Sequence, residues 1–385
     1  MRSEVLVLGA GFGGLELVTV LSAELGEDAG VTLIDASDAF VFGYSKLDVM
    51  FGRTAPDAVR LHYTDFAKPG IRFLAERVTA IDPEARRVTT DQGVHEGDSL
   101  VVALGADYDF GATPGLRGGI DEFYSVAGAE RLAGIIPGFS AGRAIVGVCG
   151  APFKCPPAPS EAALLLHDHL AERGVRESCE IRLVMPFSKP IPPSPDASEA
   201  LLEAFSDCGV EFVPGKRIAS LDRDRNVALC DDGSEEPFDL FLGVPKHRAP
   251  DVVQESGMTV DGYIPVDGRT LATSYPGVYA VGDVATVGVP KAGVFSERQA
   301  RVVAESLLEQ RRGGAPPEPY DGRGSCYIEF GAGRVGRVDV EFFSGPSPVG
   351  SLREPSSELV AEKQEFGSSR RARWFGPAQP LSSTA

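Results

Sequence analysis

A glycine-rich turn near the start of the chain has the residue types and spacing that bind a phosphate-linked ligand. It runs Gly9-Ala10-Gly11-Phe12-Gly13-Gly14. Gly9 permits the tight turn, Gly11 lets the backbone approach a pyrophosphate, and Gly14 lets the next helix pack close to its strand. Asp35 stands at the end of the following strand, where a carboxylate can accept hydrogen bonds from a ribose. The pattern predicts dinucleotide binding, and the alternative is an ordinary tight turn with Asp35 in a solvated loop.

A second turn carries reactive side chains but lacks that glycine pattern. It reads Cys149-Gly150-Ala151-Pro152-Phe153-Lys154-Cys155-Pro156-Pro157-Ala158-Pro159. Prolines have no backbone N–H to offer a phosphate, so the sequence argues against a second dinucleotide at this turn. The whole chain has six cysteines in 385 residues, which is too few for a structural disulfide framework. A disulfide here would more readily be catalytic than structural.

Both turns belong to predicted βαβ units, which are the elements that must position them. The first unit has a strand at 4–9, a helix at about 14–25 and a strand at 31–35, and the second has a strand at 144–148, a helix at 160–173 and a strand at 180–185. Further strands are expected at 71–74, 87–90, 240–245, 278–283, 325–330 and 334–343, with a helix at about 293–310. This alternation predicts an α/β fold with two Rossmann-like domains and a C-terminal β-containing segment.

Three further motifs give the chain a resemblance to a known superfamily. They are Leu104-Gly105-Ala106, Gly277-Val278-Tyr279-Ala280-Val281-Gly282-Asp283 and Ser325-Cys326-Tyr327-Ile328-Glu329-Phe330-Gly331. Over residues 1–345 the chain resembles the two-dinucleotide-fold flavoprotein disulfide reductases, and within them the sulfide:quinone oxidoreductases and the flavoprotein subunit of flavocytochrome c sulfide dehydrogenase. The resemblance implies an FAD-dependent enzyme that oxidises sulfide, or a small thiol or persulfide, and passes electrons to a quinone or another acceptor.

The resemblance also assigns catalytic roles. It pairs Cys155 with Cys326 as a disulfide that sulfide attacks, so that the sulfur remains as a persulfide while two electrons pass to the flavin. Lys154 and the start of the helix at 160–173 would favour the Cys155 thiolate. Glu161 would accept the proton of the attacking hydrosulfide. The alternatives are two inert buried thiols and a glutamate that caps its helix.

The resemblance places further residues on the cofactor. Asp283 would accept hydrogen bonds from the ribityl hydroxyls of FAD, and Gly105 and Gly282 would lie in the turns that approach it. Lys291, ahead of a predicted helix, would set positive charge beside N1 and the C2 carbonyl of the flavin, where reduction adds negative charge. A turn-forming aspartate and a solvated surface lysine are the alternatives. Because no cysteine precedes Cys149, we expect FAD to be bound noncovalently.

We expect three parts in the chain. A discontinuous FAD-binding domain takes 1–110 and 240–312, and a second Rossmann-like domain with the first redox cysteine takes 111–239. The C-terminal segment, 320–385, carries the second cysteine and a basic, aromatic run at 370–375. That run is a candidate for peripheral membrane contact, and the alternatives are a solvated tail or a contact between subunits.

Composition excludes several classes of protein. There are 37 Lys and Arg against 55 Asp and Glu, so the net charge of −18 repels phosphate backbones and no nucleic acid is expected as a partner. His167 and His169 lack the i, i+4 spacing of a metal pair, and no metal site is expected. No apolar run is long enough to span a bilayer, and the first strand begins too early for a secretion signal. The sequence therefore predicts a cytoplasmic protein, with the run at 370–375 as a candidate for contact with the inner face of the membrane, and leaves the oligomeric state open.

Two other functions fit the motifs. A type II NADH dehydrogenase would share the first glycine-rich turn, but the second turn lacks the glycines that would bind NADH. A non-catalytic flavin-binding redox sensor or interaction protein would share the fold, because a fold does not fix a function.

Overall fold

The computed structural model describes residues 4–376, and a five-stranded parallel sheet in it carries the glycine-rich turn. The strand order is β20-β9-β1-β2-β5. These strands are β1 (Val5–Leu8), β2 (Val31–Asp35), β5 (Ile71–Ala75), β9 (Ser99–Val102) and β20 (Val278–Ala280). Every residue of β1 and β9 is buried, which is typical of parallel strands covered on both faces.

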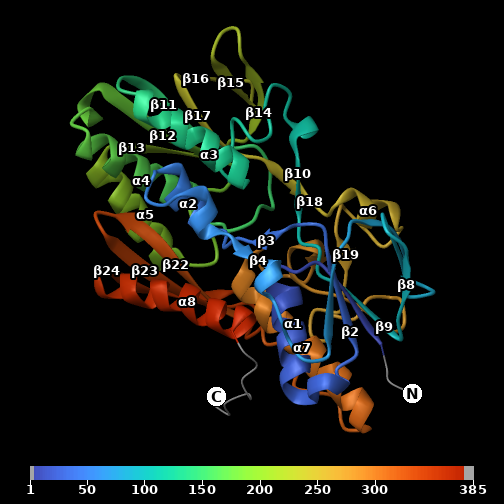
Figure 1. The fold of residues 1–385 in the computed structure, drawn as a ribbon. Coiled ribbons are helices and arrows are strands. Elements are labelled where there is room, and N and C mark those ends of the chain that lie inside the picture. Colours follow the sequence, from blue (N-terminus) through green and yellow to red (C-terminus); the bar gives the residue numbers. More distant parts are fainter. Residues whose placement is uncertain (1–3, 377–385) are drawn as a thin grey trace.

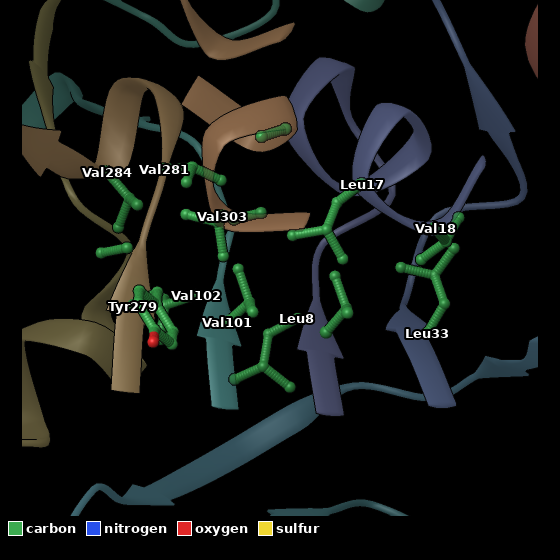
Figure 2. Close-up of a cluster of buried hydrophobic side chains, with 14 of the residues drawn as sticks. Leu8, Leu17, Val18, Leu33, Val101, Val102, Tyr279, Val281, Val284 and Val303 are labelled. Carbon is green, nitrogen blue, oxygen red and sulfur yellow. The ribbon is translucent and has the colours of Figure 1, made fainter. Parts of the chain in front are cut away.

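Two long helices lie side by side against this sheet, α1 (Phe12–Leu25) and α7 (Gly293–Arg312) (Figure 1). Their apolar side chains meet those of the strands. Figure 2 shows this core, with Leu17 and Val18 from α1 and Val303 from α7 above Leu8, Leu33, Val101 and Val102. Burial of these side chains fixes α1 against β1, and so fixes the turn that joins them.

A second parallel sheet, in the order β13-β12-β11-β17, carries the cysteine-bearing turn. Its strands are β11 (Gly142–Val148), β12 (Cys179–Met185), β13 (Val210–Pro214) and β17 (Leu240–Val244). Its helices are α3 (Val126–Ile135), α4 (Ala158–Glu172) and α5 (Pro195–Cys208). Because β17 pairs with β11, we propose that the domain boundary expected at residue 240 lies after β17. The apolar sequence of β17 would suit a strand of either parallel sheet, so its membership of the second sheet is known only from its pairing with β11. The division into domains stays a proposal, which the membership of the two sheets supports.

The C-terminal part forms a three-stranded antiparallel sheet and one helix. It comprises β22 (Arg323–Gly331), β23 (Arg334–Glu341), β24 (Val349–Ser356) and α8 (Glu358–Phe375). Ile328 and Phe330 of β22 belong to the same buried cluster as Leu164 and Leu165 of α4. This packing brings the second predicted redox cysteine, on β22, to the start of α4.

The basic, aromatic end of α8 packs largely against the rest of the protein, although Arg371 is exposed. Trp374 has no exposed surface, and its ring packs against Phe12, 5.4 Å between ring centroids. Arg370 pairs with Glu297, and Arg373 pairs with Glu16. Among residues 4–376 no helix is long and apolar enough to cross a membrane. The last nine residues of the proposed C-terminal segment lie outside the described residues.

Shorter elements connect these layers. The remaining helices are α2 (Ser45–Met50) and α6 (Asp251–Glu255). The remaining strands are β3 (Ala39–Phe40), β4 (Leu61–His62), β6 (Val78–Asp82), β7 (Arg87–Thr90), β8 (Val94–Glu96), β10 (Asp107–Asp109), β14 (Ile218–Asp222), β15 (Val227–Cys230), β16 (Glu235–Pro237), β18 (Lys246–Arg248), β19 (Ile264–Pro265) and β21 (Ala285–Thr286).

Candidate active site

The geometry of the first turn requires glycine at positions 9 and 14 and leaves open space beside Gly11. Gly9 has φ +97°, and a Cβ there would lie 2.4 Å from the carbonyl oxygen of Ala103. A Cβ on Gly14 would lie 1.9 Å from the carbonyl oxygen of Gly9. A Cβ on Gly11, by contrast, would have no atom within 4 Å. The turn therefore has room at Gly11 for a group that comes close to the backbone, such as a pyrophosphate.

Asp35 supports this turn from the next strand. One carboxylate oxygen accepts a hydrogen bond from the Ala10 N–H at 2.7 Å, and the other accepts one from the Ser37 N–H at 2.7 Å. These bonds hold the two loops together at the edge of the site. Contact between Asp35 and a ribose stays a prediction.

A cavity of about 310 Å³ brings most of the predicted site residues together. Those that line it are Gly11, Phe12, Gly13, Gly105, Cys155, Glu161, Gly282, Asp283, Lys291 and Cys326. Gly9, Gly14 and Asp35 do not line this cavity. They fix the shape of the glycine-rich turn that does line it. Residues about 170 positions apart thus share one cavity because β22 packs on α4.

Asp283 has the features expected of a cofactor ligand. Its Oδ1 atom is buried, lacks a hydrogen-bond partner among the described residues, and belongs to a residue that lines the cavity. Burial raises the pKa of its carboxyl group, while the charges of Lys154 and Lys291 oppose that rise. A buried acceptor without a partner is costly unless a ligand supplies the donor. Together with the space at Gly11, this atom fits FAD, whose ribityl chain carries hydroxyl donors.

Lys291 lies inside the protein rather than on its surface. It is 8% exposed, and its Nζ donates to the carbonyl oxygens of Asp283 at 2.6 Å and Ala285 at 3.4 Å. The same ammonium lies 3.5 Å from the ring centroid of Tyr263. Burial lowers its pKa to about 8. A fixed positive charge at this cavity is what the sequence-based role of Lys291 needs.

The two predicted redox cysteines line the cavity as half-buried free thiols. Cys155 has φ +52°. Two hydrogen bonds hold its backbone: its N–H donates to the carbonyl oxygen of Lys291 at 2.8 Å, and its carbonyl oxygen accepts from the N–H of Ala158 at 2.9 Å. Such a left-handed conformation is uncommon outside glycine and tends to occur at functional positions. Cys149, in contrast, is fully buried against the second sheet and does not line the cavity.

The geometry gives no support to the expected activation of Cys155 by Lys154. The Lys154 ammonium donates to the Ala106 oxygen at 2.7 Å and lies 4.3 Å from the centroid of the Tyr108 ring. Burial raises the pKa of Cys155 well above its usual value, and Glu161 adds to the rise. Burial likewise raises the pKa of Cys326 to about 12. Lys363 of α8, which the sequence did not single out, is a cation that lowers the pKa of Cys155 against this rise.

Glu161 does not cap its helix. It is 1% exposed, and its Oε1 accepts a hydrogen bond from the backbone N–H of Glu329 at 3.0 Å. Burial raises the pKa of Glu161 to about 7, Lys363 opposes this rise and the Glu329 charge adds to it. A carboxyl group that titrates near neutral pH beside two sulfurs can accept and release a proton there.

Sequence reasoning also missed Glu329, Arg53 and Tyr44. Arg53 binds the Glu329 carboxylate with two hydrogen bonds, at 2.7 and 3.1 Å, and Tyr44 lines the cavity. Glu329 lies on β22, Arg53 lies in the turn after α2 and Tyr44 directly precedes α2, and no spacing along the chain links them. Within residues 4–376 there is no group of three or more His, Cys, Asp or Glu side chains that could hold a metal ion.

Comparison with known proteins defines the class. Residues 3–302 match the pyridine nucleotide-disulphide oxidoreductase family, and the chain belongs to that family. The fold, shared over 99% of this chain, is that of the sulfide:quinone oxidoreductase from the bacterium Aquifex aeolicus, with a TM-score of 0.87, 21% identity and 93% of that chain covered. The predicted α/β flavoprotein fold is confirmed, and the chain is an FAD-dependent oxidoreductase.

Two relatives differ in how much of this chain they match. The chain is 25% identical over 359 residues to the mitochondrial sulfide:quinone oxidoreductase of Mus musculus, which covers 89% of this chain and 79% of that protein. It is 39% identical to a type II NADH:quinone oxidoreductase of Staphylococcus epidermidis, but only over 113 residues, or 27% of this chain and 26% of that protein. The sequence-based resemblance to sulfide:quinone oxidoreductases is thus confirmed over most of the chain.

Proposed function

We propose that this FAD-dependent enzyme oxidises sulfide, or a small thiol or persulfide, through Cys155 and Cys326 and passes the electrons to a quinone or another acceptor. The observation that carries the proposal is one cavity lined by both sulfurs, by Glu161 and by the residues that fit FAD. The names of the relatives that match most of the chain, sulfide:quinone oxidoreductases, support the same substrate and acceptor.

The sulfur chemistry would belong to the side chains of the protein. Hydrosulfide attack on a Cys155–Cys326 disulfide forms one S–S bond and breaks another, which leaves a persulfide on one cysteine and a thiolate on the other. Glu161, with a pKa of about 7, accepts the proton of the persulfide. Joining of the deprotonated persulfide to the thiolate then forms a Cys155–Cys326 trisulfide, in place of the persulfide that the resemblance implies, and releases two electrons that bound FAD would accept.

The cofactor would be held without a covalent bond. Gly11 leaves room for the pyrophosphate, Asp283 accepts from the ribityl hydroxyls, and Lys291 supplies the positive charge. Among the described residues, Cys155 and Cys326 are the cysteines that line the cavity, and both are assigned to sulfur chemistry. Acid precipitation should therefore leave the yellow colour in the supernatant, and flavin that stays with the pellet would contradict this.

The cytoplasmic location expected from the sequence is retained as part of the proposal. Peripheral membrane contact through residues 370–375 has less support, because Arg370, Arg373 and Trp374 are engaged within the protein.

The local match to a type II NADH:quinone oxidoreductase favours a second candidate function. The turn from Cys149 to Pro159 argues against it, because its prolines remove backbone donors that a second dinucleotide would need. Anaerobic mixing decides between the two. Bleaching of the flavin by sulfide, with no bleaching by NADH or NADPH, is expected. Rapid bleaching by either nucleotide would promote the dehydrogenase, and bleaching by neither sulfide nor nucleotide would favour a redox sensor.

A further inference from the structure

A cleft of about 630 Å³ lies beside the cavity that holds the two cysteines. Tyr44 and Lys363 line both spaces, so these side chains form the wall between them. Gln364 and Arg371 line the cleft and are exposed, so the cleft reaches the protein surface. A small molecule in the cleft would thus meet Lys363 before it meets either sulfur.

Charged groups alternate through this wall. The Lys363 ammonium contacts the Glu329 carboxylate, which also accepts two hydrogen bonds from Arg53, at 2.7 and 3.1 Å. Arg53 in turn pairs with Asp48 at 2.8 Å. The backbone N–H of Glu329 bonds to the buried carboxyl group of Glu161 at 3.0 Å. The Glu329 carboxylate therefore keeps a bidentate partner even when Lys363 turns away.

Lys363 can leave its present partner more easily than the other buried lysines of the cavity can leave theirs. Lys154 and Lys291 donate to backbone carbonyls that cannot move aside, at 2.7 and 2.6 Å. Lys363 is 12% exposed at its side chain, and its ammonium lies 5.2 Å from the centroid of the Tyr44 ring. Release of Lys363 costs one ion pair and leaves no buried charge unpaired.

We propose that Lys363 is the receptor for the anionic sulfur substrate: hydrosulfide, or a small thiolate or persulfide anion, enters through the cleft, replaces Glu329 as the partner of Lys363, and passes to the cavity lined by Cys155 and Cys326. The identity of the sulfur substrate rests on the proposed function. The anion selectivity of the route does not.

Alkylation of the reduced holoenzyme tests the route without any sulfide. Iodoacetate is an anion, iodoacetamide is neutral and of similar size, and both react with the same thiolates. The ratio of their rates at Cys155 and Cys326, read by peptide mass spectrometry, therefore cancels any change in thiolate fraction. Lys363→Met should lower the iodoacetate-to-iodoacetamide ratio about tenfold, and Lys363→Arg should keep it.

The control is Lys216→Met, which removes an ion pair with Asp232 at 3.1 Å, between β13 and β14 and outside both spaces. Its ratio should equal that of the wild type. Lys363→Gln serves as a second variant, and flavin content shows that each variant is folded. An unchanged ratio in Lys363→Met and Lys363→Gln, or an equal fall of both rates, would overturn the proposal.

A sulfide titration separates this proposal from the proposed function. A wild-type flavin that sulfide fails to bleach would remove the proposed function, yet a tenfold fall in the alkylation ratio would still support the anion route. A wild-type flavin that sulfide bleaches, with the same apparent KM for sulfide in Lys363→Met, would leave the proposed function in place and overturn the role of Lys363. The expected result is an apparent KM raised about tenfold.

Discussion

The indole N–H of Trp374, the single tryptophan of the chain, donates to the carboxylate of Glu16 at 2.8 Å. Glu16 lies in the first turns of α1, just after the glycine-rich turn, and has no exposed surface. Its carboxylate also accepts from Arg373 at 2.9 Å and from Arg301 at 2.7 Å. One buried carboxylate thus joins α8, α7 and α1 at the base of the cofactor site.

Glu16→Gln should weaken this junction. Burial alone would raise the pKa of Glu16, but the Arg373 hydrogen bond and the charges of Arg301 and Arg373 outweigh it and hold the pKa below its usual value of 4.5. We expect a loss of about 2 kcal/mol in the free energy of unfolding at neutral pH. Because the folded-state pKa is lowered, the wild-type advantage is present above pH 4.5 and is lost as pH falls through the lowered value. Urea unfolding followed by Trp374 fluorescence measures both effects.

Glu24→Gln is the matched control on the same helix. Glu24 pairs with Arg312 at 2.8 Å, but the two side chains are 32% and 48% exposed. An exposed pair contributes little, so the loss should be at most about 0.5 kcal/mol. If Glu16→Gln and Glu24→Gln lose the same free energy of unfolding, the buried junction contributes no more stability than an exposed ion pair.

Cys155→Ser and Cys326→Ser should each abolish flavin reduction by sulfide while FAD stays bound. Either change removes one half of the disulfide that sulfide must attack, and neither residue belongs to the glycine-rich turn. Local packing loss should stay near 1 to 2 kcal/mol. The measurement is stopped-flow flavin absorbance under anaerobic sulfide.

Cys149→Ser is the control for the cysteine variants, because Cys149 is fully buried and does not line the cavity. It should retain activity. A Cys326→Ser variant that reduces its flavin at the wild-type rate would exclude the two-cysteine mechanism. The same result for Cys155→Ser would exclude the sulfide reaction itself.

The pH dependence of the reaction should follow Glu161. Its carboxylate form accepts the proton, and burial raises its pKa to about 7, so the rate of flavin reduction should rise with pH across that value. Glu161→Gln should lower the rate about 100-fold and remove this rise. Rates measured at a fixed concentration of hydrosulfide anion separate Glu161 from the ionisation of the substrate. A rise near pH 7 that persists in Glu161→Gln would assign the proton to another group.

Stability gives a second readout for Glu161. Because its folded-state pKa is raised from 4.5 to about 7, its contribution is fully present below pH 4.5 and is lost as pH rises through 7. Between pH 4.5 and 8 the wild type should lose about 2 to 3 kcal/mol relative to Glu161→Gln. Urea unfolding at both pH values measures the difference.

The shape of the glycine-rich turn could be predicted because local spacing determines it, whereas the role of Asp283 came from the resemblance and stays a prediction. Gly9 and Gly14 are required by backbone contacts within one βαβ unit, and a strand pattern places Gly282 and Asp283 at a strand end. The pairing of Cys155 with Cys326 came from resemblance alone, and the shared cavity gives it support.

The electrostatics of the site could not be predicted from sequence. Lys154 is adjacent to Cys155 along the chain, yet the ammonium points to the Ala106 oxygen, and the nearby cation comes from Lys363 on α8. Neighbours along a chain face different ways, and the direction of each side chain depends on tertiary packing. For the same reason Arg370 and Arg373 of α8, which read as part of a basic surface, instead pair with the buried carboxylates of Glu297 and Glu16.

Gly11→Ala should separate folding from FAD binding. An added Cβ at Gly11 has no protein atom within 4 Å, and Gly11 has an ordinary backbone with φ −81°, so the apoprotein should keep its melting temperature. The methyl group would occupy the space into which the pyrophosphate fits, so FAD affinity should fall at least about tenfold. Gly14→Ala is the contrast, because its Cβ would lie 1.9 Å from the Gly9 oxygen and should cost about 2 kcal/mol of stability in the apoprotein itself. Flavin-to-protein absorbance after gel filtration and apoprotein melting measure the two effects. Full flavin content in Gly11→Ala would mean that the cofactor phosphates do not approach this turn.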